Sequence, residues 1–307
     1  MNPGLSPTWW DRFWFAEGSP YDLAGARIVV ALQALWILLS RDIPAVADLP
    51  AGFWDGVRTQ LWRFLIVPGH PRLEYGLQGL AIVALVAAAL GVWTRVSCLS
   101  AALLLYHLGP LESILWWGDP GERGLELPIL ALVVLAAAPC GDVWSLHRPR
   151  NHAAPAGWQY RWPLLLIQAF YICIYVFGAY GKLYTSGLAW MGGGNIRELI
   201  WSMGVWPSTG PFERFGPFLA SLPGVPLAIG VFTIAFEFAF PLVLFSRTAR
   251  RIMIPAAFAF HLGIAVAMNL AFPNTPLLLL FVNWDWLRHR LRRRDGGAVA
   301  PPATTTS

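Results

Sequence analysis

The stretch RWPLLLIQAFYICIYVFGAYGKLY, residues 161–184, decides the fold. It carries no charged side chain between Arg161 and Lys182, and an α-helix needs roughly 20 apolar residues to cross a bilayer. Further apolar segments lie on both sides of it, near residues 24–40, 74–93, 96–117, 125–140, 224–246, 251–271 and 273–287. We therefore predict an all-α fold, a polytopic membrane helix bundle of about eight transmembrane helices.

The composition favours the same class of protein. Hydrophobic residues make up 56% of the chain and charged residues 13%, whereas a soluble domain carries roughly 25% charged residues. So few charges cannot cover the surface of a soluble globule. Tryptophan occurs 17 times, often at the ends of the apolar segments, where the headgroup layer favours its amphipathic ring. We expect the lipid bilayer as a partner and the cell membrane as the location.

Positive charge predicts the orientation. The net charge of +5 comes largely from the arginines between Arg288 and Arg294, which follow the last apolar segment and suit anionic lipid headgroups better than nucleic acid. We expect no nucleic-acid partner. With eight spans, Lys and Arg gather on the side of the two termini, and short loops rich in these residues stay in the cytoplasm. Both termini of this multi-pass protein are therefore predicted to be cytoplasmic.

Three regions follow from this pattern. Residues 1–23 form an aromatic interfacial N-terminal segment, residues 24–287 the transmembrane bundle, and residues 288–307 a basic and then disordered cytoplasmic tail. The segments 125–140 and 273–287 are short for a span. The second of them begins with the breaker PNTP (273–276), so its apolar part is long enough only for half a span.

Two long outer connections, residues 41–73 and 185–223, each contain apolar residues at helical spacing. This spacing predicts interfacial helices that lie on the outer membrane surface and roof a cavity, the second of them capped by Asn195. The stripes consist of Trp54, Val57, Leu61 and Leu65 in the first connection, and of Ile196, Leu199, Ile200 and Met203 in the second.

Lys182 is the first candidate for chemistry, because it is the only lysine in a chain otherwise rich in arginine. A desolvated lysine can lose its proton and act as a base, whereas arginine stays charged. The alternative is structural: near the outer end of its segment, the side chain could extend to the lipid headgroups.

Glu237 and His261 fall near the middle of their apolar segments. An ionisable group at the bilayer centre costs about 2.5–3.5 kcal/mol on insertion scales, so such residues pair or line a wet site. Adjacent helices make a Glu237–His261 pair plausible, as a functional site or as a hydrogen bond between two helices.

His107 lies in the segment 96–117, and is either a packing residue or a contact for a substrate. A metal site would need His107, Glu237 and His261 to converge from three helices, and the sequence gives no sign of this. Cys98, Cys140 and Cys173 show no metal-ligand spacing either. We predict no metal site.

Several stretches of the chain together form a familiar pattern. The most specific stretch is YVFGAYGKL (175–183), followed by Trp190 and Gly193. The others are GARIVVALQAL (25–35), GVWTR (91–95), PCGDVWS (139–145), EFAFP (237–241) and Phe260-His261. Together they resemble the HTTM family, the horizontally transferred transmembrane domain, which is similar to the membrane domain of vitamin K-dependent gamma-glutamyl carboxylases.

This resemblance implies a role for Lys182 as the base that deprotonates a quinol, before oxygen attacks the ring. As further candidates we take Glu237 and His261 as catalytic residues, and Trp190, Gly193 and His107 as substrate contacts. A reduced quinone is then the expected cofactor or substrate. A secreted peptide is the expected alternative, because small members of the family are associated with the maturation of exported toxin peptides.

Three classes of function stay open at this point. The first is a lysine-dependent, carboxylase- or epoxidase-like enzyme acting on a quinol or a secreted peptide at the outer face. The second is a non-catalytic membrane protein, such as a peptide-toxin maturation partner, an immunity factor, or a lipid or quinone binder. The third is a proton-coupled transporter that uses the Glu237–His261 pair, although no inverted repeat supports it.

Overall fold

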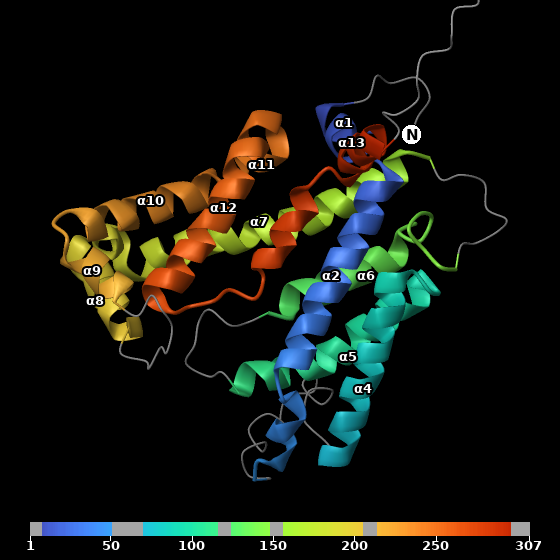
Figure 1. Ribbon diagram of the computed structural model, residues 1–307, viewed down its shortest axis with the longest axis horizontal. Coiled ribbons are helices and arrows are strands. Elements are labelled where there is room, and N and C mark those ends of the chain that lie inside the picture. The colour runs from blue at the N-terminus through green and yellow to red at the C-terminus, as the bar shows by residue number, and fades with distance from the viewer. Residues whose placement is uncertain (1–7, 51–69, 116–123, 148–155, 205–213, 296–307) are drawn as a thin grey trace, which may run out of the picture.

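The computed structural model describes residues 8–50, 70–115, 124–147, 156–204 and 214–295, and within these ranges the chain forms helices and no strand (Figure 1). The all-α class is therefore confirmed for the described part of the chain. The α-helices are α1 (Trp9–Trp14), α2 (Pro20–Ser40), α4 (Pro71–Leu90), α5 (Thr94–Leu115), α6 (Glu126–Ala137), α7 (Trp158–Ser186), α8 (Gly193–Gly204), α9 (Phe215–Ser221), α10 (Val225–Ala239), α11 (Leu242–Phe245), α12 (Arg247–Met268) and α13 (Trp284–Asp295). The 3-10 helices are η1 (Ile43–Asp48), η4 (Gly187–Met191) and η5 (Thr275–Phe281).

The helices form two groups that meet near the start of α2 and α7 (Figure 1). In the first group α2 packs on α4, α4 on α5, and α5 on α6. In the second group α10 packs on α7 and on α8, and α12 packs on α8, α9 and η5. Helix α2 also contacts α7, η5 and α13, so one continuous core of buried apolar side chains runs through both groups.

Four helical segments of the described chain are long and apolar enough to cross a membrane: α2, α4, α7 together with η4, and α12. A fifth span results if α9 and α10, which meet at a bend of 103°, are taken as one broken crossing. Helix α6 is apolar but has only 12 residues. Several apolar helices are thus present and fit a membrane location, whereas the count of eight spans stays a prediction.

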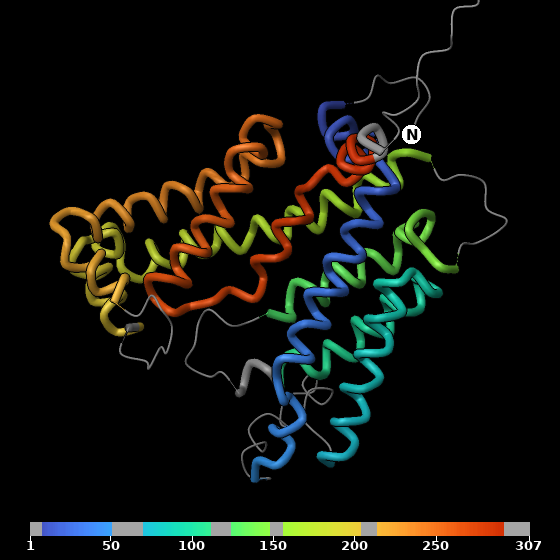
Figure 2. The backbone as a smooth tube through the Cα atoms, in the orientation of Figure 1, coloured from blue at the N-terminus to red at the C-terminus, as the bar shows by residue number. Residues whose placement is uncertain are grey.

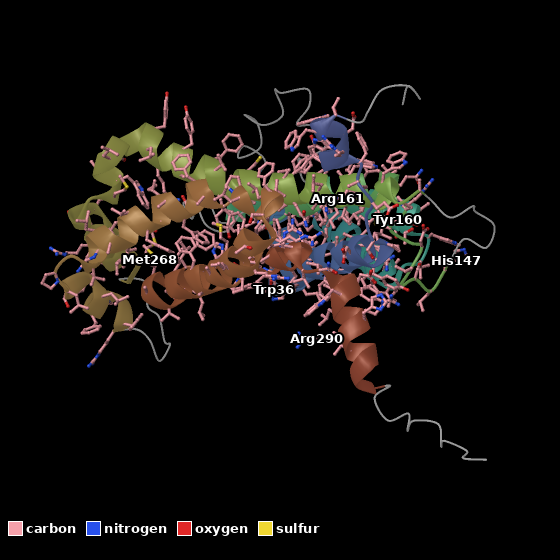
Figure 3. All side chains as sticks on the ribbon, turned by 90° about the horizontal axis from the view of Figure 1, so that it is seen from above. Trp36, His147, Tyr160, Arg161, Met268 and Arg290 are labelled. Carbon is pink, nitrogen blue, oxygen red and sulfur yellow. The ribbon has the colours of Figure 1, made fainter. Side chains whose placement is uncertain are left out.

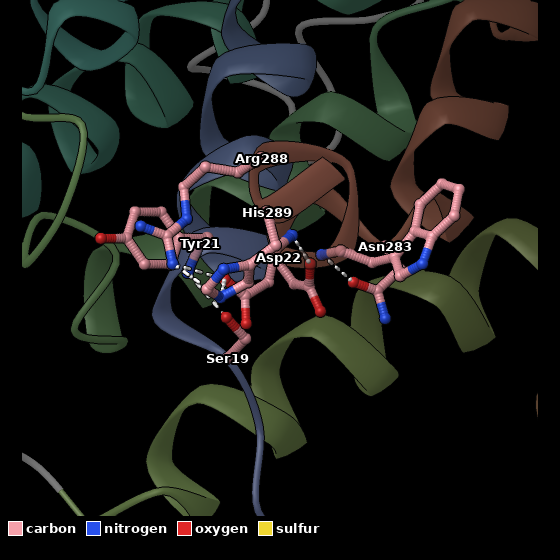
Figure 4. A network of polar contacts seen from close by, with 8 residues as sticks. Ser19, Tyr21, Asp22, Asn283, Arg288 and His289 are labelled. Carbon is pink, nitrogen blue, oxygen red and sulfur yellow. Dashed lines mark hydrogen bonds and ion pairs between the residues drawn. The ribbon is translucent and has the colours of Figure 1, made fainter. Parts of the chain in front are cut away.

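The last apolar segment, 273–287, is not one continuous helix. It forms the 3-10 helix η5, which ends at Phe281, and then the first turn of α13. At about 2 Å rise per residue, η5 reaches only about half of the hydrocarbon thickness. The chain nevertheless returns from the end of α12 to the start of α2 (Figure 2). There the Asp285 amide donates to Asp22 Oδ1 at 3.1 Å, and the Arg288 guanidinium lies 3.8 Å from the Tyr21 ring centre (Figure 4).

The predicted interfacial helices have different outcomes. The first stripe, Trp54 to Leu65, lies outside the described residues. The second corresponds to α8, whose Ile196 and Ile200 are buried against Ala220 of α9. The helix begins at Gly193, so Asn195 does not cap it; its side-chain amide donates to the Trp190 carbonyl at 2.8 Å instead. Helix α8 is therefore amphipathic, and its place on a membrane surface stays a prediction.

Three of the stretches quoted for the family resemblance meet at one junction. The fully buried Arg27 of α2 donates through Nη1 to the Cys140 carbonyl at 2.6 Å and through Nη2 to the Trp144 carbonyl. Ser145 in turn donates to the Gly91 carbonyl, and the His147 amide donates to the same oxygen at 3.2 Å. These contacts give GARIV, GVWTR and PCGDVWS a structural role, because they tie the starts of α2 and α5 to the end of α6.

Candidate functional site

Helix α7 presents Tyr175, Gly178 and Lys182 on one face, because residues three, four and seven apart lie above one another on an α-helix. This face is directed toward α10. A Cβ atom built on Gly178 would lie 3.5 Å from Lys182 Nζ and 3.7 Å from Glu237 Oε2. Gly178 thus lies beside the two charged groups, and even a methyl group there would meet them at ordinary van der Waals distance.

Lys182 and Glu237 form an ion pair between α7 and α10. The Lys182 ammonium donates to Glu237 Oε1 at 2.6 Å and to Oε2 at 2.7 Å. The lysine side chain is 26% exposed and the glutamate side chain 9%, so one partner is buried and the other is accessible. Because each charge partly compensates the other, the pair explains how two ionisable groups are accommodated in an apolar helix group.

Trp190 lies next to this ion pair. Lys182 Nζ is 5.3 Å from the centre of the Trp190 ring, within the range of a cation–π contact. The tryptophan comes from η4, which begins at Gly187, a residue with φ of +56° that a side chain would strain. The turn at Gly187 therefore brings Trp190 back to the lysine near the end of α7.

Gly193 lies on the rim of the same region and not at the charged groups. A Cβ atom on Gly193 would be 3.4 Å from the Leu227 amide nitrogen on α10. Gly230 is closer still, since a Cβ there would be 2.6 Å from the Met191 carbonyl oxygen. The small residues of η4, α8 and α10 thus permit close backbone approach behind Trp190.

His261 does not pair with Glu237, which corrects the expected contact between them. His261 Nε2 lies 2.7 Å from the Tyr175 hydroxyl, while its Nδ1 is buried without a hydrogen-bond partner among the described residues. The rotation of α10 and α12 causes the difference, because Glu237 turns toward α7 near Lys182. Aromatic rings surround the Tyr175–His261 contact: Tyr171, Phe236, Phe240, Phe260 and Phe272.

His107 lies in the other helix group. Its Nε2 is 2.8 Å from Glu74 Oε2, which joins α5 to α4, and the Glu74 side chain is fully buried. The structure therefore brings Lys182, Glu237 and Trp190 together and pairs His261 with Tyr175 of the same helix as Lys182. His107 is on α5, which lies in the other helix group (Figure 1). Within the described ranges, no three His, Cys, Asp or Glu side chains converge in a way that could hold a metal ion.

Sequence reasoning missed two partners of the predicted residues. Tyr175 stands in the quoted YVFGAYGKL stretch, and its distance of two helical turns from Lys182 was the available signal. Glu74 lies in the first turn of α4, at the edge of its apolar segment, where a charged residue does not stand out in the sequence. Only the packing of α4 on α5 reveals that it faces His107.

Comparison with known proteins found no family model, no curated protein and no solved structure that matches this chain. The resemblance to the HTTM family thus stays a prediction that rests on the residues quoted above.

Proposed function

We propose that this protein is a multi-pass membrane enzyme in which Lys182 accepts a proton from a lipophilic quinol at the outer face. The observation that carries the proposal is the contact of Lys182 Nζ with both carboxylate oxygens of Glu237, at 2.6 and 2.7 Å. At these distances Glu237 can accept a proton from Lys182, so the lysine has a second proton acceptor behind it. The resemblance to vitamin K-dependent carboxylase membrane domains supports the choice of quinol.

In this proposal Lys182 is the base, and Glu237 accepts the proton that Lys182 must first lose. Within one hydrogen bond, a proton can pass from the ammonium to the carboxylate, which leaves an amine lone pair on Lys182. That lone pair takes the proton of an acidic hydroxyl, and Glu237 keeps the first proton close for later release. Arginine in place of Lys182 could form the same ion pair but could not act as the base, because it stays protonated.

The surroundings fit a flat aromatic substrate in two respects. The Trp190 ring lies beside the lysine and offers a surface for stacking, and the lysine side chain is partly exposed. The surrounding helices are apolar, which suits a substrate that reaches the site from the bilayer. With dioxygen as the oxidant, a quinol gives the quinone epoxide and water, so atoms and electrons balance.

The test uses the purified protein in lipid, supplied with reduced naphthoquinone and oxygen. We expect epoxide from the wild type, none from Lys182→Arg, and wild-type yield from Arg95→Lys, a conservative exchange at an exposed position of α5. Equal epoxide from Lys182→Arg would remove the lysine from the chemistry. No epoxide from the wild type would remove the quinol.

The non-catalytic alternative retains one specific observation in its favour. A bidentate ion pair between α7 and α10 also joins two helices. If that were its only role, Lys182→Arg would keep the ion pair and leave function unchanged. In that case the protein would bind or guard against a secreted peptide at the outer face. The transport alternative loses its proposed proton site, because Glu237 and His261 have separate partners.

A further inference from the structure

The ends of α7 and α12 that lie near α1 carry a cluster of arginines. Arg161 is in the first turn of α7, while Arg247 and Arg250 are in the first turn of α12. Arg161 interacts electrostatically with Arg247, and Arg250 interacts with both. In Figure 3 Arg161 is labelled on α7, next to α1. Three like charges from two helices are therefore close enough to influence one another.

The acidic residues at this end do not neutralise the cluster. Asp22 interacts with Arg161 and Arg250, but its carboxylate accepts the amide of Asp285 at the start of α13, and no ion pair within bonding distance joins it to a described arginine. Glu17 is exposed and forms no ion pair with a described residue. Arg161 Nε is buried and has no hydrogen-bond partner in the described chain. Arg250 Nε, by contrast, donates to the Val243 carbonyl at 3.1 Å. The cluster thus keeps an excess of positive charge and one unsatisfied donor.

Two helices start at this end of the molecule. Helix α7 begins after Gly157 without a side-chain cap, and its Gln159 and Tyr160 amides donate to the carbonyls of Ala156 and Gly157 at 2.9 and 3.2 Å. Ser246 caps α12 by accepting from the Ala249 amide at 3.2 Å. Helix N-termini attract anions, and arginine matches the oxygens of a phosphate with its planar fork of N–H groups.

Exposed aromatic side chains lie next to the cluster. Phe13 of α1 stacks on Phe245 of α11 with ring centres 5.3 Å apart, and Phe245 is followed directly by the cap of α12. Trp9 and Trp10 are 60% and 57% exposed. Exposed tryptophan beside arginine is the composition that the boundary between headgroups and acyl chains selects.

From these observations we propose that Arg161, Arg247 and Arg250 bind the phosphate of an anionic phospholipid, while α1 rests in the adjacent headgroup layer. The inference requires the membrane placement of the proposed function but not its lysine chemistry, so either can fail without the other. A lipid phosphate supplies what the cluster lacks: negative charge, several acceptor oxygens, and acyl chains that lie along the apolar helices.

The test is retention of lipid by the full chain. The protein is reconstituted in phosphatidylcholine vesicles with or without phosphatidylglycerol, and native mass spectrometry measures the phosphatidylglycerol that stays bound after mild detergent extraction. We expect Arg161→Gln and Arg247→Gln each to lower retention about fivefold, since an arginine near a membrane surface contributes about 1 kcal/mol. Arg95→Gln, the same loss of charge at an exposed position of α5, should retain the lipid as the wild type does.

Two further arms decide whether charge at this cluster is the cause. Arg161→Lys keeps the charge and should retain most of the lipid, which separates loss of binding from loss of folding. Inorganic phosphate should not displace the lipid. Equal retention by the Gln variants and Arg95→Gln, or displacement by inorganic phosphate alone, would overturn the proposed phospholipid site.

Discussion

At the scale of single residues, three ionisable groups inside the described apolar helices have polar partners from neighbouring segments. Lys182 has Glu237, His107 has Glu74, and Arg27 has the carbonyls of Cys140 and Trp144. Each partner offsets part of the free-energy cost of burying a polar or charged group away from water. The consequence is that loss of one partner should cost more than loss of both.

The Lys182–Glu237 pair allows this consequence to be measured. Lys182→Met leaves the glutamate unpaired beside apolar rings and should lower the free energy of unfolding by about 1–3 kcal/mol. The double variant Lys182→Met/Glu237→Leu should recover most of that loss, because no charge is left behind. Thermal unfolding in one fixed detergent measures both. The single variant Glu237→Leu completes the comparison. If the loss of unfolding free energy in the double variant equalled the sum of the losses in Lys182→Met and Glu237→Leu, the two residues would not be coupled.

Arg27 makes a second prediction at this scale. Arg27→Met leaves the Cys140 and Trp144 carbonyls without their donor and should destabilise the protein by about 2–4 kcal/mol. Arg95→Met, in the same region but exposed, should change stability by less than about 0.5 kcal/mol. Urea unfolding of both variants beside the wild type measures the difference. Equal midpoints would show that the buried guanidinium does not hold the junction.

At the scale of the elements, the site depends on how closely α10 approaches η4. Gly230→Ala would place a methyl group 2.6 Å from the Met191 carbonyl, so the helix or the turn that carries Trp190 must shift. We expect a loss of quinol chemistry with the fold retained. Gly194→Ala is the control, because a Cβ there meets nothing within 4 Å. Similar activity of the two variants would mean that this approach does not position Trp190.

Individual elements show what sequence could predict. The span predicted at 161–184 is α7, Trp158–Ser186, because its length and apolar character are local properties of the chain. The pairing of Glu237 was not predictable in the same way. Its partner depends on how α10 is rotated about its own axis, which packing between helices fixes. For the same reason the sequence predicted Glu237 as a site residue but paired it with His261, whereas its partner in the structure is Lys182.

The broken elements were the hardest to predict. Helices α9 and α10 meet at 103° around Leu222–Gly224, and η5 replaces the α-helix expected at 273–287. Both breaks contain Pro residues, so the sequence showed where regular helix ends. It did not show the direction of the chain beyond the break, since that is set by contacts of α9 with α8 and of η5 with α2.

At the scale of the whole molecule, the proposal places Lys182 at a site that opens to the outer face while both termini stay inside. The described helices fit a membrane location, and the start of α13 lies beside the start of α2. If these helices cross the bilayer, the two ends of the bundle therefore lie on one side. The orientation of the bundle in the membrane and the accessibility of Lys182 from outside can therefore be tested together.

The most direct measurement uses the fact that Lys182 is the only lysine of the chain. Intact cells are treated with a membrane-impermeant, amine-reactive reagent, with or without reduced naphthoquinone, and modification of Lys182 is measured by mass spectrometry. Lys182→Arg supplies the background. We predict modification from outside that reduced naphthoquinone suppresses. Modification only after the membrane is opened, or modification that the quinol does not change, would contradict an outward-facing quinol site at Lys182.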